Sequence, residues 1–124
     1  MPRVIHYEIH ADNPERAADF YRKVFGWKIE KWGPVEYWLV DSGQGPGING
    51  AIKKRGKPAV EDSFSAYVCT ISVPSIDEAM KKIEENKGRI ITPKMAITGI
   101  GWNAYFKDTE GNTAGIMQED ASSK

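Results

Sequence analysis

The sequence predicts an α+β fold, and three observations support this class. The same pattern occurs twice, with Ile9 aligned on Ile71 and Gly26 on Gly88 at one constant offset. Alternating apolar and polar residues open the first copy, which is typical of a strand exposed on one face, and a strand is expected at the equivalent place in the second copy. A helix start and a helix stop then follow at equivalent places in both copies. Repetition on this scale predicts two copies of one supersecondary unit.

The first copy, about residues 3–55, is expected to form a strand, a helix and three further strands. Ile5, Tyr7 and Ile9 alternate with polar residues, which predicts the first strand and places these three side chains under the helix. The helix is expected to begin after Asn13, an N-cap acceptor followed by proline, and to end at Gly26. Strands are expected at 27–32, 36–41 and 48–54, between turns rich in glycine and proline.

The second copy, about residues 65–120, follows a polar linker at about 56–64 and repeats the order. A strand is expected at 65–73, and Ser75 with Glu78 forms a capping box for the second helix, which ends at Lys87 and Gly88. Strands follow at 89–92, 101–107 and 113–118. The segment 93–102, longer than its counterpart in the first copy, is either a flap or a plain hairpin extension. Residues 108–112 are expected to form a turn.

Composition fits a single domain over residues 1–124, because 40% apolar and 27% charged residues are typical of a globular chain. Lys+Arg and Asp+Glu balance at 17 each, so neither nucleic acid nor an anionic membrane is an expected partner. No signal peptide or membrane span is evident, and we expect a cytoplasmic protein. The single cysteine, Cys69, agrees with a reducing compartment and is expected to be a small core residue rather than a reactive thiol.

Two βαβββ modules with Phe20-Tyr21, Phe25-Gly26 and the Asp-x-Glu-Gly-Asn turn at 108–112 resemble the vicinal oxygen chelate superfamily. This superfamily includes glyoxalase I, extradiol dioxygenases, fosfomycin thiol transferases and bleomycin-binding resistance proteins. The resemblance covers nearly the whole chain. It implies tandem modules that form curved mixed sheets around a concave pocket, with the helices on the outer face. It also implies a homodimer, with modules paired within the chain or across a dimer. It does not specify the reaction, because the superfamily supports several chemistries on one fold.

The resemblance also implies where a divalent metal would bind, on His or Glu side chains of the first and last strands of each module. Only His6 of this sequence matches such a ligand. Its counterpart Val68 cannot ligate, Gly115 stands at the glutamate position of the last strand, and residues 48–52 contain no carboxylate. The sequence therefore predicts no tightly bound metal or other cofactor. A weak divalent site on His6, Glu8 and His10 remains an alternative.

His6 and Glu8 lie two residues apart on the first strand, so both side chains are expected on the pocket face, about 6.5–7 Å apart. If the protein is an enzyme, they are the predicted catalytic acid/base pair. The alternative for His6 is a half-buried strand histidine that hydrogen-bonds a neighbour. Glu8 favours a functional role, because a carboxylate in an apolar concavity is costly unless it is paired or hydrogen-bonded.

The predicted ligand-binding residues are tryptophans and small hydroxyl residues on the strands. A flat or apolar ligand would be lined by aromatic side chains, and core packing or a dimer contact is the alternative for each of them. The hydroxyl residues are expected on the pocket face of the second copy. The set is Trp27, Trp38, Thr70, Ser72 and Trp102.

Two functions stay open from the sequence. The missing metal ligands favour a metal-poor small-molecule binding or sequestration protein of the bleomycin-resistance type. The alternative is a glyoxalase-like lyase/isomerase, or a dioxygenase-related enzyme, that uses His6 and Glu8 with or without a divalent metal. In both cases the expected partners are a small-molecule ligand and a second copy of the chain.

Overall fold

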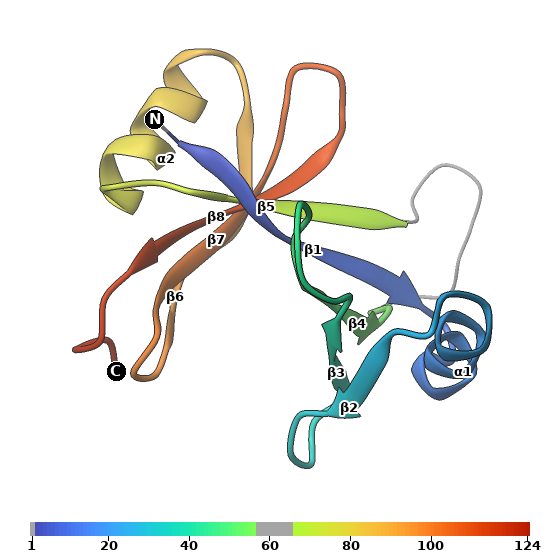
Figure 1. Ribbon diagram of the computed structural model, residues 1–124. Coiled ribbons are helices and arrows are strands. Elements are labelled where there is room, and N and C mark those ends of the chain that lie inside the picture. The colour runs from blue at the N-terminus through green and yellow to red at the C-terminus, as the bar shows by residue number, and fades with distance from the viewer. Residues whose placement is uncertain (1, 57–65) are drawn as a thin grey trace. The chain divides into compact units, whose positions relative to one another are not determined.

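The computed structural model describes residues 2–56 and 66–124 and shows two successive βαβββ modules there (Figure 1). Module one consists of β1 (Arg3–Ala11), α1 (Pro14–Phe25), β2 (Lys28–Lys31), β3 (Tyr37–Asp41) and β4 (Gly50–Lys54). Module two consists of β5 (Tyr67–Ser72), α2 (Ile76–Glu85), β6 (Arg89–Ile97), β7 (Gly101–Lys107) and β8 (Thr113–Glu119). The predicted α+β class and the repeated element order are confirmed.

The chain forms two compact units that correspond closely to the modules. One unit is His6–Val68, and the other combines the N-terminal residues as far as Ile5 with Cys69–Lys124. The strands β1 and β5 are therefore each divided between the units. All but the first residue of the predicted linker at 56–64 lie outside the described residues.

The sheet of module one has the strand order β2-β3-β4-β1. β1 runs parallel to β4, and β3 pairs antiparallel with both β2 and β4. The face covered by α1 carries the buried core of Ile9, Ala11, Ala18, Ile29, Val40 and Ile52. Gly50 is required on this face, because a Cβ there would lie 2.5 Å from the ring of Tyr7. The opposite face of the sheet is not covered by the helix of this module.

The sheet of module two has the strand order β5-β8-β7-β6. Its helix-side core consists of Ile76, Ala104 and Ile116, with Ile71, Val73, Ala79, Met80, Ile83, Trp102 and Phe106 packed around them. β6 continues to Ile97 and β7 begins at Gly101, so the longer segment of the second copy is a hairpin extension and not a flap. The β6–β7 register shifts on both sides of Thr92, beside Pro93, which has no N–H to donate.

Side-chain caps begin both helices as predicted. Asn13 accepts a hydrogen bond from the backbone N–H of Arg16 at 3.0 Å, and Ser75 accepts one from Glu78 at 3.2 Å. Gly26 ends α1 in the left-handed conformation, with φ of 73°.

The end of α2 differs in one respect from the predicted stop. The left-handed residue there is Lys87, with φ of 72°, although glycine follows directly. The N–H of Gly88 donates to the carbonyl of Ile83 at 2.8 Å, and that of Lys87 donates to Glu84 at 3.3 Å, which is a Schellman arrangement. Gly88 is needed for close packing instead, because a Cβ there would lie 2.7 Å from Cγ2 of Ile83.

Two predicted core residues are not in the core. Ile5 is 38% exposed, and Cys69 is also exposed. The helix-side cluster of module one includes β1 only from Tyr7 onward, and that of module two includes β5 only from Ile71 onward. The alternation along each strand is right, but the helices do not reach these two residues.

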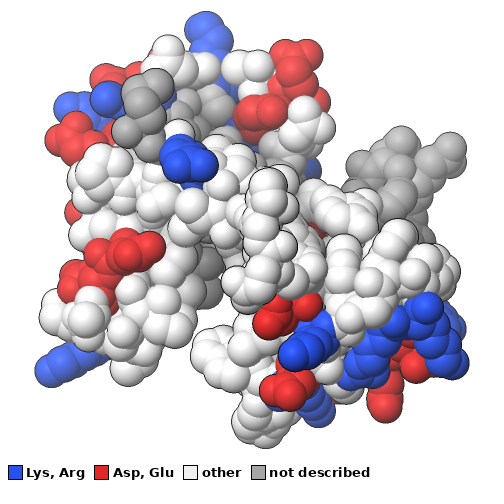
Figure 2. Space-filling model, in the orientation of Figure 1, with Lys and Arg blue, Asp and Glu red and all other residues white. Residues whose placement is uncertain are grey.

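The described surface carries charges of both signs. Figure 2 shows acidic side chains interspersed with the basic ones over α1, where Lys23 and Asp19 form an ion pair at 2.8 Å. No helix in the described ranges is both long enough and apolar enough to cross a membrane.

Candidate functional site

Four polar side chains meet on the face of module one opposite α1. Nε2 of His6 lies 3.0 Å from the hydroxyl oxygen of Tyr37, and that hydroxyl donates a hydrogen bond to Oε2 of Glu8 at 3.1 Å. Nε2 of His10 lies 3.3 Å from Oε1 of Glu8. Glu8 is only 5% exposed, so these contacts replace hydrogen bonds that its carboxylate would make in water. We refer to His6, Glu8, His10 and Tyr37 as the polar cluster.

The strand register explains how Tyr37 reaches residues on β1. β4 lies between β3 and β1, and Ala51 of β4 stands directly opposite Glu8. Ala51 is completely buried, and its small side chain leaves room above β4 for a long neighbour. The ring of Tyr37 therefore spans β4 and places its hydroxyl between Glu8 and His6. A basic residue, Lys53, is paired in register with both Tyr37 and His10.

The environment favours the neutral form of His6. Burial lowers the pKa of this imidazole below its ordinary value, and the nearby charge of Glu8 opposes that effect by raising it. A neutral imidazole has one nitrogen that donates and one that accepts a hydrogen bond. His6 can therefore accept a hydrogen bond or a proton from a bound molecule through whichever nitrogen carries no hydrogen.

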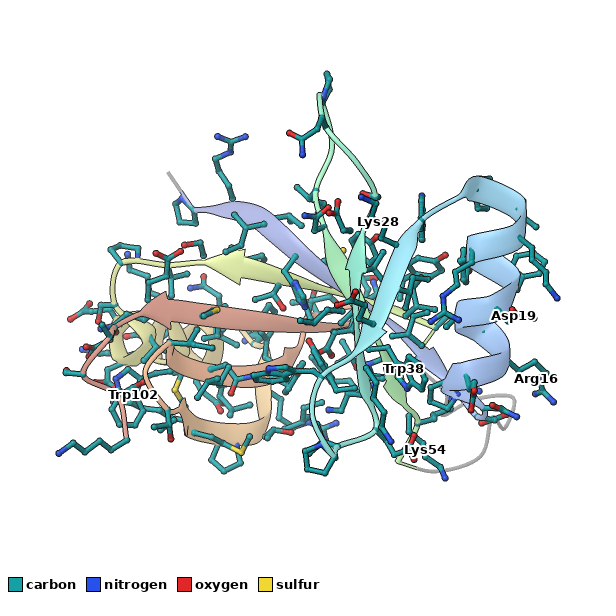
Figure 3. All side chains as sticks on the ribbon, turned by 60° about the horizontal axis from the view of Figure 1, so that its bottom comes forward. Arg16, Asp19, Lys28, Trp38, Lys54 and Trp102 are labelled. Carbon is teal, nitrogen blue, oxygen red and sulfur yellow. The ribbon has the colours of Figure 1, made fainter. Side chains whose placement is uncertain are left out.

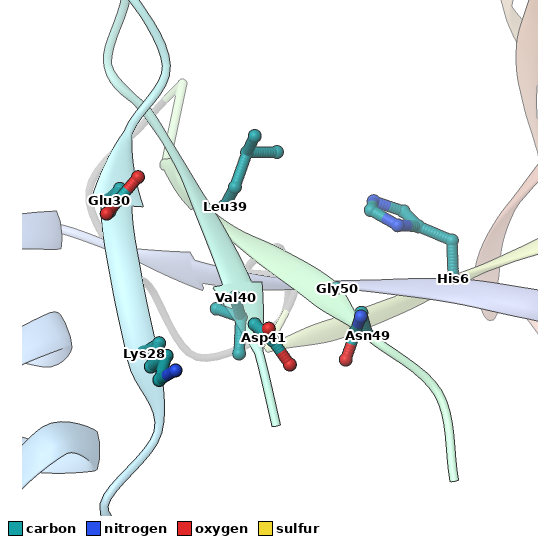
Figure 4. Close-up of a pocket in the computed structure, with 8 residues that line it drawn as sticks. All are labelled: His6, Lys28, Glu30, Leu39, Val40, Asp41, Asn49 and Gly50. Atoms are coloured by element: carbon teal, nitrogen blue, oxygen red, sulfur yellow. The ribbon is translucent and has the colours of Figure 1, made fainter. Parts of the chain in front are cut away.

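His6 also lines a hollow of about 390 Å³ in module one, a size within the range of small-molecule sites (Figure 4). Figure 4 shows its imidazole extending from β1 in the direction of β3. The hollow is lined by His6, Lys28, Glu30, Leu39, Val40, Asp41, Asn49 and Gly50. Two carboxylates and one ammonium group make its lining rich in hydrogen-bond acceptors.

The rim of the hollow is fixed where β3 is connected to β4. Oδ1 of Asn49 accepts a hydrogen bond from the backbone N–H of Ser42 at 3.0 Å. The hydroxyl of Ser42 donates to the carbonyl of Ile48, also at 3.0 Å. These bonds tie the start of the loop to its end, so Asn49 lies at a defined place on the rim.

The structure brings the two predicted catalytic residues, His6 and Glu8, into one cluster, joined through Tyr37. Sequence reasoning missed Tyr37, and it missed most of the residues that line the hollow. Alternation along β3 would have placed Tyr37, Leu39 and Asp41 on one face. It does not reveal that β3 lies one strand away from β1, or that Ala51 leaves the space between them open.

Two of the predicted ligand-binding tryptophans lie on the α1 side of module one. The ring of Trp27 stacks on that of Tyr21, with 5.1 Å between centroids and 6° between planes. Trp38 packs against the core cluster, and the guanidinium carbon of Arg22 lies 5.9 Å from its ring centre (Figure 3). Both rings therefore contact the covered face of the sheet, opposite the polar cluster. A ligand contact by either one stays a prediction.

The third tryptophan, Trp102, packs against the helix-side cluster of module two (Figure 3). Its Nε1 donates a hydrogen bond to Oδ2 of Asp120 at 3.1 Å, and the ammonium nitrogen of Lys94 lies 4.7 Å from its ring centre. These contacts hold Trp102 in place at the start of β7, and a ligand contact by it stays a prediction.

Thr70 and Ser72, the predicted hydroxyl residues, lie on β5 within the unit that does not contain His6. Thr70 is buried and stands opposite Gly115 in register, while Ser72 is half-buried and stands opposite Met117. That Thr70 and Ser72 face the same pocket as His6 stays a prediction.

The residues present do not fit the divalent metal site that the resemblance implies. Nε2 of His6 is engaged with Tyr37, Val68 is buried and has no donor atom, and no carboxylate lies on β4. A Cβ at Gly115 would lie 3.1 Å from Oγ1 of Thr70, so little room remains for a ligating side chain. No group of three or more His, Cys, Asp or Glu suited to a metal ion occurs among the described residues.

A family model described as Glyoxalase/Bleomycin resistance protein/Dioxygenase superfamily matches residues 3–116. Among curated proteins, none matches the sequence significantly.

Solved structures share the fold at low sequence identity. A glyoxalase/bleomycin resistance protein/dioxygenase superfamily member from Vibrio splendidus 12B01 is 15% identical, with a TM-score of 0.67 over 96% of this chain and 100% of that one. An NAD-dependent benzaldehyde dehydrogenase from Legionella pneumophila is 14% identical, with a TM-score of 0.65 over 93% and 98%. Methylmalonyl-CoA epimerase from Mycobacterium tuberculosis is 13% identical, with a TM-score of 0.62 over 94% and 87%.

Proposed function

This chain belongs to the Glyoxalase/Bleomycin resistance protein/Dioxygenase superfamily, and from that premise we propose that it binds a small polar organic molecule in the hollow of module one. The observation that carries the proposal is the buried polar cluster beside that hollow, with His6 as the residue common to both. A sheet face that served only packing would place apolar residues at these positions, because a buried carboxylate is costly unless it is hydrogen-bonded. The mixed polar and apolar lining suits an organic ligand.

In this function the protein binds its ligand without a tightly held metal. Nε2 of His6, Nε2 of His10 and both carboxylate oxygens of Glu8 are engaged within the cluster. The positions where further metal ligands are expected carry Val68 and Gly115. A ligand held by hydrogen bonds and apolar contact needs none of these missing groups.

We further propose that the protein is a cytoplasmic homodimer. Support for the homodimer comes from α1, whose side chains Phe20, Val24 and Phe25 are 56%, 55% and 61% exposed. Large exposed aromatic residues are enriched in protein interfaces. Light scattering after size-exclusion chromatography tests the stoichiometry, and a strictly monomeric chain would contradict it.

Thermal-shift measurements on the full chain test binding directly. The organic probes are metal-free bleomycin, spermidine, methylmalonyl-CoA and S-lactoylglutathione, and zinc and nickel ions are tested separately. A probe that binds the folded state raises its stability by about 2.7 kcal/mol at one hundred times its Kd. We expect stabilisation by at least one organic probe and none by the ions. Stabilisation by the ions alone, or by no probe, would contradict the proposal.

A matched pair of variants localises the binding. His6→Gln changes a residue that lines the hollow, whereas His10→Gln changes a residue of the same cluster that does not line it. The first is expected to weaken probe binding at least tenfold, and the second to leave it within about twofold. Equal losses would place the ligand elsewhere.

The second candidate function is a metal-free lyase or isomerase. It is favoured by the pairing of a neutral imidazole with a buried carboxylate through one hydroxyl, which is an arrangement suited to moving a proton. Incubation with methylmalonyl-CoA in deuterated water tests it, because proton abstraction next to the thioester would introduce deuterium. Incorporation that disappears in His6→Gln supports catalysis. Absence of incorporation, with binding retained, supports the binding protein.

A further inference from the structure

The hydrogen-bond donors and acceptors of the polar cluster determine which nitrogen of His6 carries its proton. An ionised carboxylate only accepts hydrogen bonds, so the Tyr37 hydroxyl must donate its single proton to Glu8. The same oxygen lies 3.0 Å from Nε2 of His6, and in this contact it can only accept. Nε2 must therefore be the nitrogen that carries the hydrogen. Nε2 of His10 lies 3.3 Å from the other oxygen of Glu8, so both carboxylate oxygens have a partner within the cluster.

The remaining nitrogen of His6, Nδ1, is then an acceptor with a free lone pair. No hydrogen bond within the described residues uses Nδ1, and the imidazole lines the hollow (Figure 4). Lowering of the His6 pKa by burial keeps this nitrogen unprotonated at neutral pH. The hollow thus combines the lone pair of Nδ1 with the carboxylates of Glu30 and Asp41.

We infer that Tyr37 is a positioning residue that holds His6 as the Nε2–H tautomer and leaves Nδ1 as an acceptor at the hollow. This inference rests on the proposed function only for the identity of the site. It also narrows the ligand class: the site favours a molecule that presents N–H or O–H donors, such as an amine or a polyol. Lys28 is the one ammonium group among the lining residues and provides a place for a single anionic group.

The tautomer can be measured without any ligand. The chain contains only two histidines, so two-bond proton–nitrogen correlation spectra of ¹⁵N-labelled protein contain two imidazoles, assigned with His10→Gln. Spectra are recorded near pH 8, above the ordinary histidine pKa of about 6.5. We expect His6 to show a protonated Nε2 and an unprotonated Nδ1. The opposite tautomer in the native chain would overturn the inference.

Two variants test the role of Tyr37. Tyr37→Phe removes the acceptor for Nε2–H, and we expect His6 to shift to a mixture of both tautomers. Tyr21→Phe is the matched control, because its hydroxyl bonds Tyr67 at 2.8 Å and does not contact the polar cluster. An unchanged His6 spectrum in folded Tyr37→Phe would overturn the inference.

Glu8→Gln provides an independent test that keeps the tyrosine. A glutamine amide can donate to the hydroxyl of Tyr37, which would free that hydroxyl to donate to His6. We therefore expect a population of the Nδ1–H tautomer to appear, and its absence would count against the inference. Because these readouts use the ligand-free chain, a failure of every probe to bind would contradict the proposed function and leave the tautomer assignment intact.

Discussion

The hydroxyl oxygen of Tyr37 lies 3.0 Å from Nε2 of His6, although the two residues stand 31 positions apart and β4 runs between their strands. This contact depends on Ala51, whose small side chain leaves the space above β4 open. Through it, side chains of two strands that are not neighbours, β1 and β3, form one polar cluster. The cluster is therefore a tertiary feature of module one and not a local motif.

Removal of the central carboxylate is expected to destabilise the protein. Glu8→Ala leaves the hydroxyl of Tyr37 and Nε2 of His10 without their buried acceptor, which typically costs about 1–3 kcal/mol. Urea denaturation measures the free energy of unfolding. Glu85→Ala, at an exposed position on α2, is the control and is expected to change it by less than about 0.5 kcal/mol. Equal effects of the two variants would show that the cluster contributes no stability.

The lowered pKa of His6 predicts a specific dependence of stability on pH. Because the folded-state pKa lies below the unfolded value of 6.5, the unfolded state binds more protons between the two values. The stability contribution is fully present above pH 6.5 and is lost as the pH falls through the folded pKa. His6→Gln is expected to flatten this acid slope in thermal midpoints measured across the range. A slope that is unchanged in the variant would assign the loss to other groups.

The hydroxyl of Tyr67 is expected to lose its proton only at high pH. Burial, followed by its hydrogen bond with the hydroxyl of Tyr21, raises the pKa of Tyr67 to about 12. Its folded-state pKa exceeds the ordinary value of 10, so its contribution to stability is present below pH 10 and is lost as the pH rises through about 12. Ultraviolet titration of the tyrosines should show a late component. Tyr67→Phe should remove that component, and its persistence would assign it to another tyrosine.

Because the backbone of Lys87 is left-handed, replacing this residue with glycine is expected to stabilise the protein. A residue with a Cβ is penalised by about 1–2 kcal/mol in this conformation, whereas glycine loses more chain entropy on folding. Lys87→Gly is therefore expected to raise the free energy of unfolding by about 0.5–1 kcal/mol. Lys81→Gly, in the interior of the same helix, should instead lower it by about 1 kcal/mol. A destabilised Lys87→Gly would show that the side chain contributes more than the strain costs.

Chelation is expected to leave the protein unchanged. Treatment with EDTA should not shift the thermal midpoint, because the predicted metal positions contain Val68 and Gly115 and Nε2 of His6 is already hydrogen-bonded. Elemental analysis after purification without chelators provides the direct measurement. About one zinc, nickel, iron or manganese ion per chain, with a midpoint that falls on chelation, would contradict the prediction.

Much of the fold was predictable because its signals are local. The strand β1, the cap at Asn13 and the left-handed stop at Gly26 each depend on a few neighbouring residues, and all three are confirmed. The errors have a different origin. Ile5 and Cys69 follow the correct alternation, but their burial depends on how far each helix extends over its sheet, and a strand pattern does not contain that length.

The candidate site was only partly predictable for the same reason. His6 and Glu8 lie on one strand, so their proximity follows from the two-residue period. Tyr37 joins them through the strand order and through the size of Ala51. The lining residues of the hollow likewise come from four stretches of sequence that meet only in the folded module. Pairwise register, and not composition, decides which side chains share a site.

The irregular pairing of β6 beside Pro93 affects how the protein behaves at high concentration. β6 is the last strand in its sheet, and a regular outer strand presents a row of unpaired amide groups on which further chains can assemble. The register shifts around Thr92 break that row, and the imino acid beside it has no hydrogen to offer. Replacing Pro93 with a β-branched residue would lengthen the part of the edge strand that can pair with another chain, and it would favour fibril-like aggregates.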